Sequence, residues 1–229
     1  MTQYGPLAVL VAFAAGVEGL SWWWRRRHHA RLARWARQEG WTYVARKDGW
    51  VDVWSGRPFA RGWFPQARSV MAGSFGPHRA IVFEYSHRDD RRYHFRVHYS
   101  VHALALPARL PSTHLSAEGV GDRASALIGL QDIELESDEF NRAYRVRSED
   151  HRFASDLLNP RTMEMLLRCG GPDVRIGAGY IVLVTDGPLD PTSVYGALTV
   201  LATMLENLPD YVWSDRGARA PRSWEGGRP

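Results

Sequence analysis

The feature that most constrains this chain is an apolar run near its N-terminus that leads directly into tryptophan and then arginine. Residues 7–24 read LAVLVAFAAGVEGLSWWW, and Arg25, Arg26 and Arg27 follow at once. As a helix, such a run extends about 27 Å, close to the ~30 Å hydrocarbon core of a bilayer. The run therefore predicts one transmembrane helix within residues 1–24.

The residues on either side of the run predict its orientation. Trp22, Trp23 and Trp24 are expected at the membrane–water interface, where indole rings prefer to lie. Residues 1–6 carry no charged side chain, whereas three arginines follow the run. The positive-inside rule then places the C-terminal side in the cytoplasm. A cleaved signal peptide carries its positive charge before the apolar run, so we expect an uncleaved single-pass protein of the cell membrane. An ordinary buried helix is the alternative.

Two details of the run bear on its interactions. Glu18 is costly inside a bilayer, and we expect it to snorkel, to be protonated or to pair with Arg25 rather than to serve a proton or ion path. The pairs Ala12/Gly16 and Ala15/Gly19 have the small-xxx-small spacing that allows two helices to pack closely. A homodimer is therefore one expected partner arrangement.

The charge of the chain is unevenly distributed. Residues 1–39 carry six arginines against Glu18 and Glu39, a net charge of +4 that equals the formal charge of the whole protein. Residues 40–213 are net negative, and the tail 214–229 is net positive. Because a nucleic-acid-binding domain carries its positive charge on the folded part, we expect no nucleic-acid partner. Residues 25–39 are predicted to form a basic juxtamembrane helix whose Arg25–Arg37 segment contacts anionic headgroups, or only sets the topology.

Residues 40–213 are predicted to form a cytoplasmic α+β domain. The fold expected is a mainly antiparallel sheet with helices packed on one face and a long C-terminal helix, preceded by the transmembrane helix. The clearest strand covers residues 92–106, where apolar and polar side chains alternate, which is typical of a half-buried strand. Other strands are expected near residues 41–45, 69–75, 80–85, 133–135, 140–146, 175–177 and 180–185. Helices are expected after Ser148, Asn159 and Asp190, and the tail 214–229 is predicted to be disordered.

The aromatic residues between positions 47 and 66 are predicted to pack a loop onto the core, which is their commoner use. Binding of a ligand or sugar is the alternative. They are Trp50, Trp54, Phe59, Trp63 and Phe64.

No pattern in the sequence predicts a reaction. His94, His98 and His102 are four residues apart, which on a strand is ~13 Å and too far for one metal ion. The single cysteine, Cys169, excludes an internal disulfide and a cysteine zinc site. Neither a G-x-G-x-x-G nor a Walker pattern occurs. We therefore expect no cofactor, no metal and no catalytic residue.

Three functional classes follow from these observations. The leading hypothesis is a non-enzymatic protein-binding, scaffolding or accessory module at the membrane. The first alternative is a lipid- or small-ligand-binding domain with a pocket lined by the Tyr93–Val101 face. The second is a membrane-bound hydrolase or transferase that uses His94, His98, Asp132 and Glu134.

Several short motifs follow one another along the chain: Arg57-Pro58-Phe59, Ser69-Val-Met-Ala-Gly73, Val82-Phe-Glu-Tyr85, Glu136-Ser-x-x-Phe-Asn141, Tyr144-x-Val146, Leu158-Asn-Pro160 and the methionine–leucine segment that includes Met165. Their order resembles that of a bacterial family of membrane-anchored proteins, in which a hydrophobic N-terminus precedes a domain of unknown function. The resemblance covers roughly residues 35–210 and implies no activity, cofactor or catalytic residue.

Overall fold

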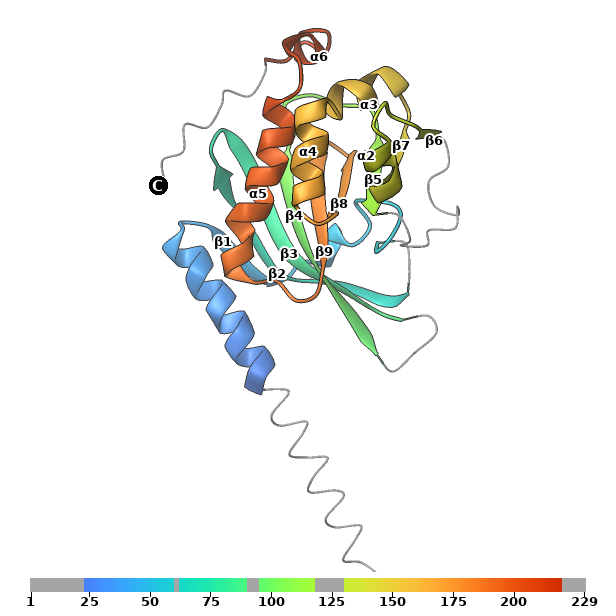
Figure 1. Ribbon diagram of the computed structural model, residues 1–229. Helices are drawn as coiled ribbons and strands as arrows, with labels where there is room; N and C mark the ends of the chain where they lie inside the picture. Colours follow the sequence, from blue (N-terminus) through green and yellow to red (C-terminus); the bar gives the residue numbers. More distant parts are fainter. Residues whose placement is uncertain (1–22, 60–61, 90–94, 118–129, 220–229) are drawn as a thin grey trace, which may run out of the picture.

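The computed structural model describes residues 23–59, 62–89, 95–117 and 130–219, which form one antiparallel sheet with helices against it (Figure 1). The strands are β1 (Thr42–Arg46), β2 (Trp63–Phe75), β3 (His78–Arg88), β4 (Arg96–Ala105), β5 (Thr113–Ala117), β6 (Gln131–Ile133), β7 (Tyr144–Ser148), β8 (Asp173–Gly177) and β9 (Tyr180–Asp186). The helices are a segment over residues 23–38, the 3₁₀ turn η1 (Asp48–Trp50), α2 (Asp138–Ala143), α3 (His151–Leu157), α4 (Pro160–Arg168), α5 (Pro191–Glu206) and α6 (Asp210–Ser214). The predicted α+β class with a mainly antiparallel sheet is confirmed.

The sheet has nine strands in the order β1-β2-β3-β4-β9-β8-β5-β7-β6. The first four strands follow one another along the chain and pair as neighbours. The fifth neighbour is β9, which pairs antiparallel with β4 and brings a late segment of the chain into the middle of the sheet. The first half of the chain is thereby joined to the second through β4 and β9.

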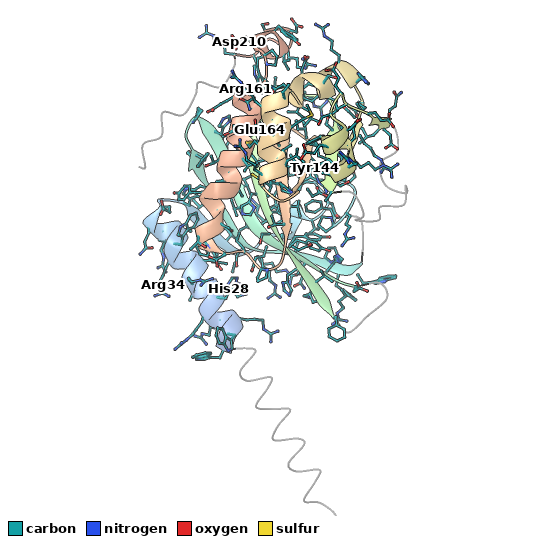
Figure 2. The ribbon with its side chains drawn as sticks, in the orientation of Figure 1. His28, Arg34, Tyr144, Arg161, Glu164 and Asp210 are labelled. Atoms are coloured by element: carbon teal, nitrogen blue, oxygen red, sulfur yellow. The ribbon has the colours of Figure 1, made fainter. Side chains whose placement is uncertain are left out.

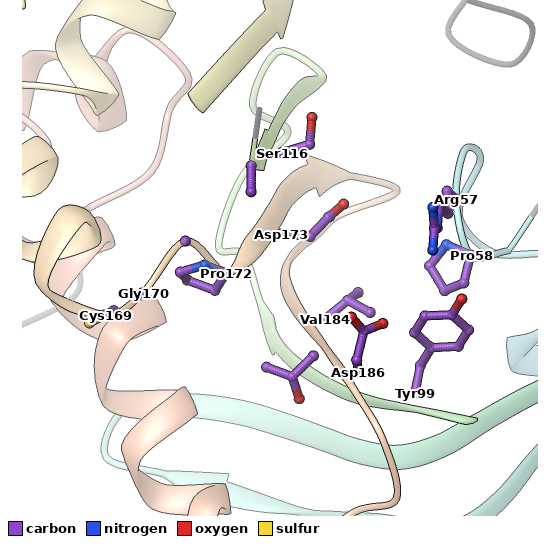
Figure 3. A pocket seen from close by; sticks show the side chains of 13 residues that line it. Arg57, Pro58, Tyr99, Ser116, Cys169, Gly170, Pro172, Asp173, Val184 and Asp186 are labelled. Atoms are coloured by element: carbon purple, nitrogen blue, oxygen red, sulfur yellow. The ribbon is translucent and has the colours of Figure 1, made fainter. Parts of the chain in front are cut away.

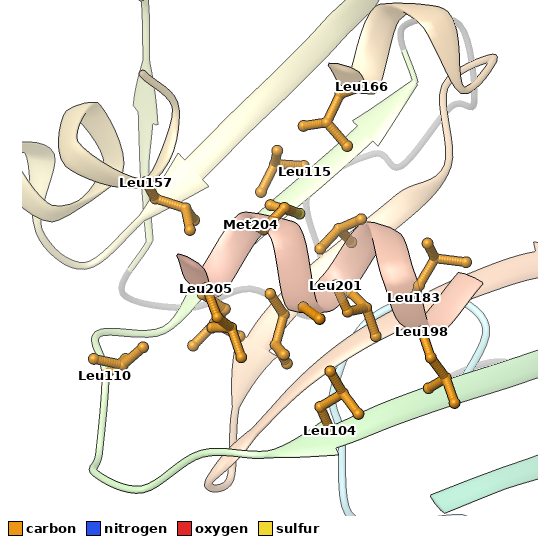
Figure 4. Packing of buried hydrophobic residues seen from close by; sticks show 14 of the residues in the cluster. Leu104, Leu110, Leu115, Leu157, Leu166, Leu183, Leu198, Leu201, Met204 and Leu205 are labelled. Carbon is orange, nitrogen blue, oxygen red and sulfur yellow. The ribbon is translucent and has the colours of Figure 1, made fainter. Parts of the chain in front are cut away.

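Helix α5 covers one face of the sheet and contacts β4 and β9. Val194, Leu198, Leu201 and Leu205 are fully buried, as their spacing predicts, and Figure 4 shows three of these leucines above Leu104 of β4. Burying each such side chain stabilises the fold by roughly 1.5–3 kcal/mol. The helix is shorter than the long C-terminal helix expected, since Asn207 ends it and Pro209 precedes the separate five-residue α6.

The segment that contains η1 and continues to Phe59 covers the opposite face. The Trp54 ring stacks 6.1 Å from Phe83, and the Phe59 ring lies 4.9 Å from Tyr85. The predicted packing of this aromatic loop is confirmed for Trp54 and Phe59, both 6% exposed. It is wrong for Trp63 and Phe64, which are exposed at the start of β2.

The helix over residues 23–38 is part of the folded domain. Leu32 and Ala36 are fully buried, and the Trp35 ring lies 5.6 Å from Trp41 and 5.8 Å from Tyr195 of α5. Gly40 follows the helix with a φ of 70°, the left-handed conformation common after a helix end. The basic helix is thus fixed to the sheet by its apolar side.

The starts of two helices are as predicted, and two other local predictions are wrong. The side chains of Asn159 and Asp190 accept hydrogen bonds at the starts of α4 and α5, each followed by proline. Asp150 caps α3 in place of Ser148, because Ser148 is still the last residue of β7. Phe140 lies in a short helix rather than a strand, since the Ser137 side chain caps α2.

Among the described residues, no helix is long and apolar enough to cross a membrane. The predicted span lies almost wholly within residues 1–22, outside the described part of the chain, and so do Glu18 and Trp22. Most of the predicted disordered tail, residues 220–229, lies outside it as well.

Candidate functional site

A cleft of about 890 Å³ lies between the helix over residues 23–38 and the first half of the sheet. Residues of three neighbouring strands form its floor, and the helix and the loop before α5 form its sides. The lining residues are Trp24, Arg25, His28, His29, Gln66, Arg68, Glu84, Ser86, Arg96, His98 and Pro188. Most of these side chains are polar or charged.

The strand register explains why polar side chains gather there. Arg68 of β2 pairs with Glu84 of β3, and Ser86 of β3 pairs with His98 of β4. Alternate residues of a strand share a face. These polar side chains therefore lie on the same face of the sheet as the apolar side chains that α5 covers. The face becomes polar near the N-terminal end of α5, and the N-terminal helix lies over that part.

Glu84 joins the helix to the sheet and is only 5% exposed. Its Oε1 lies 2.7 Å from Nε2 of His28 and accepts a hydrogen bond of 3.1 Å from the backbone N–H of Leu189. Figure 2 shows His28 on the side of the helix toward the sheet and Arg34 on the other side. Burial raises the pKa of Glu84, but the hydrogen bonds from His28 and Leu189 and the nearby His29 outweigh it, so the pKa lies below its usual value. Glu84 is therefore an ionised, hydrogen-bonded carboxylate at neutral pH.

Ser69 lies beneath Glu84 at an irregular point in β2. Its φ of 49° is in the left-handed region, next to the register shift between Arg68 and Met71. Its Oγ lies 2.7 Å from Nδ1 of His29 and 3.5 Å from Oε2 of Glu84. Burial lowers the pKa of His29, so its ring favours the neutral form.

These three side chains do not form a nucleophilic triad. Ser69 is fully buried, so a substrate cannot reach its hydroxyl. The same ring nitrogen of His29 faces both Ser69 at 2.7 Å and Glu84 at 3.8 Å. In a catalytic triad the two imidazole nitrogens divide these roles.

The floor of the cleft carries two arginines, Arg68 of β2 and Arg96 of β4. Arg96 donates to the carbonyl and hydroxyl oxygens of Ser86 at 3.2 and 2.9 Å and to the carbonyl of Phe64 at 3.3 Å. Burial lowers the pKa of Arg96, and the positive charges of Arg68, Arg88 and Arg46 lower it further. Since Glu84 is the one carboxylate among the described residues that line the cleft, this end of the sheet has a positive potential.

The predicted membrane-interface residues that the structure describes lie at the start of the helix. Trp23 and Trp24 are exposed, and the guanidinium of Arg27 lies 3.7 Å from the centre of the Trp23 ring. Trp24 and Arg25 also line the cleft, whereas Arg26 and Arg27 do not. The cleft thus begins where the predicted span ends.

The residues of the hydrolase hypothesis do not come together. His98 lies in the cleft, and His94 lies outside the described residues. Asp132 is on β6 at the far edge of the sheet, and Glu134 directly follows that strand. The Asp132 carboxylate accepts hydrogen bonds from Arg145 and Arg147. These ion pairs join β6 to the neighbouring strand β7.

Among the described residues of the Tyr93–Val101 face, only Tyr99 borders a hollow, one of about 270 Å³. Tyr99 and Val101 are buried in the cluster formed with Trp54 and Phe59. The prediction of an open polar face on the same strand is also partly wrong. Ser100 and His102 are 3% and 1% exposed, because helices cover that side as well.

A buried charged cluster, which no sequence pattern predicts, holds the aromatic loop. Arg175 of β8 donates to the carbonyl oxygens of Ser55 and Arg57 and to Asp173, the last at 2.6 Å. Asp173 also lies 3.0 Å from Nε2 of His114. Burial raises the pKa of Asp173, but Arg175 and His114 bring it below its usual value. These side chains bind one another and the loop backbone, which indicates a structural role.

A second hollow of about 270 Å³ lies on the other side of that cluster (Figure 3). Cys169 and Gly170 lie at one end, and Arg57 and Pro58 lie at the other. Among the described residues, no group of three or more His, Cys, Asp or Glu side chains is placed to hold a metal ion. This hollow therefore offers less organised chemistry than the cleft beside the helix.

The fold and the cleft define a sheet-and-helix domain whose positively charged site adjoins its N-terminal helix. No protein-family model matches the chain, and no curated protein matches it either. Among solved structures it is similar to the mycobacterial trehalose monomycolate transport factor A, TtfA, with a TM-score of 0.60 and 14% sequence identity. The similarity covers 80% of this chain and 97% of that one. At this identity the two proteins share a fold.

Proposed function

We propose that this protein is a single-pass protein of the cell membrane whose domain faces the cytoplasm and acts as a non-enzymatic binding or accessory module. The observation that carries the proposal is the attachment of the helix over residues 23–38 to the sheet. Its apolar side is buried and His28 binds Glu84. A chain anchored through residues 7–24 would hold the domain rigidly at the membrane surface.

Three further observations support this proposal. The apolar run, the tryptophans and the arginines stand in the order expected of a span with a cytoplasmic C-terminal side. The motif resemblance to membrane-anchored bacterial proteins agrees with that order. The structurally similar TtfA is described as a transport factor, which is consistent with an accessory role for a domain of this fold.

Ligand binding at the membrane is the second candidate. One observation favours it. The cleft of about 890 Å³, the largest of the clefts described above, adjoins the helix over residues 23–38, which follows the predicted span in the chain. A partner protein could use the same surface, and a homodimer could form through the small residues of the span.

Extraction of membranes with alkaline carbonate tests the anchoring. The full chain should stay in the membrane pellet, whereas the double variant Leu10→Asp/Phe13→Asp should shift to the supernatant, since each charge in a span costs about 2.5–3.5 kcal/mol. The control Gln38→Asp/Thr199→Asp adds the same charges at exposed positions and should stay in the pellet. A wild-type chain found in the supernatant would contradict the proposal.

A further inference from the structure

We propose that the cleft beside the N-terminal helix binds the phosphate-bearing headgroup of an anionic phospholipid. The proposal rests on the proposed function, because it requires the cleft to lie at a membrane surface. It goes beyond general attraction between a basic helix and lipid, since it assigns the binding to arginines of the sheet.

The balance of charge in the cleft favours an anion. Arg25, Arg68 and Arg96 line it, and Glu84 is buried and already accepts hydrogen bonds from His28 and Leu189. A surplus of guanidinium groups facing one cavity is unfavourable without an anion. Arginine binds phosphate through two parallel hydrogen bonds, which suits a phosphodiester.

The arginine donors of the sheet are firmly held. Arg96 is fixed by its hydrogen bonds to Ser86 and to the carbonyl of Phe64, and the Nε of Arg68 donates to Gln66 at 3.0 Å. Side chains held in this way lose little conformational entropy when they bind. His98 lies beside them on the same face and adds a further hydrogen-bonding group.

The aromatic rim of the cleft indicates that the anion belongs to a lipid. Seven large apolar side chains of the described residues are exposed, and four of them stand at the start of the helix or at the start of β2. Trp24 lines the cleft, and the backbone carbonyl of Phe64 accepts a hydrogen bond from Arg96. The other two are Trp23 and Trp63. Aromatic side chains prefer the membrane interface, so this rim would rest on the bilayer while the cleft receives a headgroup.

The test uses the full chain in a neutral detergent, with binding followed by native mass spectrometry. The probes are dioctanoyl-phosphatidylglycerol, dioctanoyl-phosphatidylcholine and inorganic phosphate. We expect phosphatidylglycerol to bind at least about tenfold more tightly than phosphatidylcholine, the size expected for one charge-assisted hydrogen bond. The double variant Arg68→Gln/Arg96→Gln should lose this preference.

The matched control is Arg34→Gln/Arg37→Gln. It removes the same charge from exposed positions of the helix outside the cleft and should keep the preference. If both double variants lose the preference for phosphatidylglycerol equally, the binding is non-specific electrostatic attraction and the proposal is overturned. If inorganic phosphate displaces phosphatidylglycerol at a similar concentration, the cleft binds free phosphate rather than a lipid headgroup, and the proposal of a lipid ligand is overturned.

Folding is checked by thermal unfolding of each variant. If the double variant unfolds, Arg68→Gln alone decides, because Arg68 donates to the side chain of Gln66, which is itself replaceable, whereas Arg96 donates to backbone carbonyls. Carbonate extraction separates the two proposals. A protein that stays in the membrane without lipid preference contradicts this inference alone, and a protein that leaves the membrane contradicts the proposed function.

Discussion

Nε2 of His28 lies 2.7 Å from Oε1 of Glu84, and this contact joins the N-terminal helix to the middle of the third strand. The two residues are 56 positions apart in the sequence. The contact fixes how the helix over residues 23–38 packs on the sheet and therefore forms one side of the cleft.

Replacement of Glu84 by Gln should loosen the helix. The amide keeps the shape of the side chain but removes the charge that His28 and the Leu189 N–H stabilise. We expect a loss of about 1–3 kcal/mol of unfolding free energy and faster amide hydrogen exchange over residues 23–38. The control Arg31→Gln removes an exposed ion pair with Asp190 of 3.7 Å and should change the stability by less than about 1 kcal/mol. If amide hydrogen exchange over residues 23–38 is the same in Glu84→Gln as in the wild type, the contact between His28 and Glu84 does not hold the helix.

The free energy of unfolding should fall as the pH is lowered from neutral. Burial lowers the pKa of His102 from 6.5 to about 4, so the unfolded chain binds the proton more readily than the folded one between these values. The contribution of neutral His102 to the free energy of unfolding is complete above pH 6.5 and is lost as the pH falls toward 4. The free energy of unfolding then changes by up to about 1.4 kcal/mol per pH unit. Burial lowers the pKa of His29, His78 and His98 as well, which adds to the same trend.

Denaturant unfolding at several pH values measures that slope. The variant His102→Leu should show a shallower slope than the wild type, whatever its absolute stability. The control His151→Leu changes an exposed histidine at the start of α3 and should keep the wild-type slope. Equal slopes in all three proteins would contradict the prediction.

Replacement of Arg175 by Met should destabilise the protein strongly. Asp173 would stay largely buried without its guanidinium partner, and the carbonyls of Ser55 and Arg57 would lose their donor. Removal of one partner from a buried ion pair costs about 3–5 kcal/mol. The control Arg145→Met removes an exposed partner of Asp132 and should cost less than about 1 kcal/mol. Similar unfolding midpoints for the two variants would show that the cluster is not a structural brace.

A methyl group at Gly73 should displace Trp41. A Cβ there would lie 2.4 Å from the Trp41 ring, which packs on β2. Such overpacking costs about 1–3 kcal/mol, so Gly73→Ala should unfold at a lower denaturant concentration. Gly177→Ala is the matched control, because it is also a strand glycine and has open space around it. A Gly73→Ala protein as stable as this control would contradict the packing described for Trp41.

The local parts of the fold could be predicted from the sequence where one physical signal dominates. Alternation predicted β4, and the Asn159-Pro160 and Asp190-Pro191 pairs predicted the starts of α4 and α5. The sequence did not reveal that helices cover the polar side of β4, because alternation shows two faces without showing what lies on them.

The cleft was harder to predict for the same reason. Glu84 is the single acid in the run Ala80–Tyr85, which is otherwise apolar except for the Tyr85 hydroxyl. His28 stands among arginines that were already explained as a topology signal. Their contact depends on where the helix packs, which no local pattern encodes. A lone carboxylate within an apolar run was the one available signal, since a carboxylate that becomes buried needs a partner.

Labelling of Cys169 with a membrane-impermeant maleimide tests the central claim most directly. It is the only cysteine of the chain and is exposed at the end of α4. The proposed membrane protein with a cytoplasmic domain should sediment with the membranes and should react with the reagent only after the cells are lysed. Labelling of Cys169 in intact cells, or recovery of the unlabelled protein in the soluble fraction, would contradict the proposed topology.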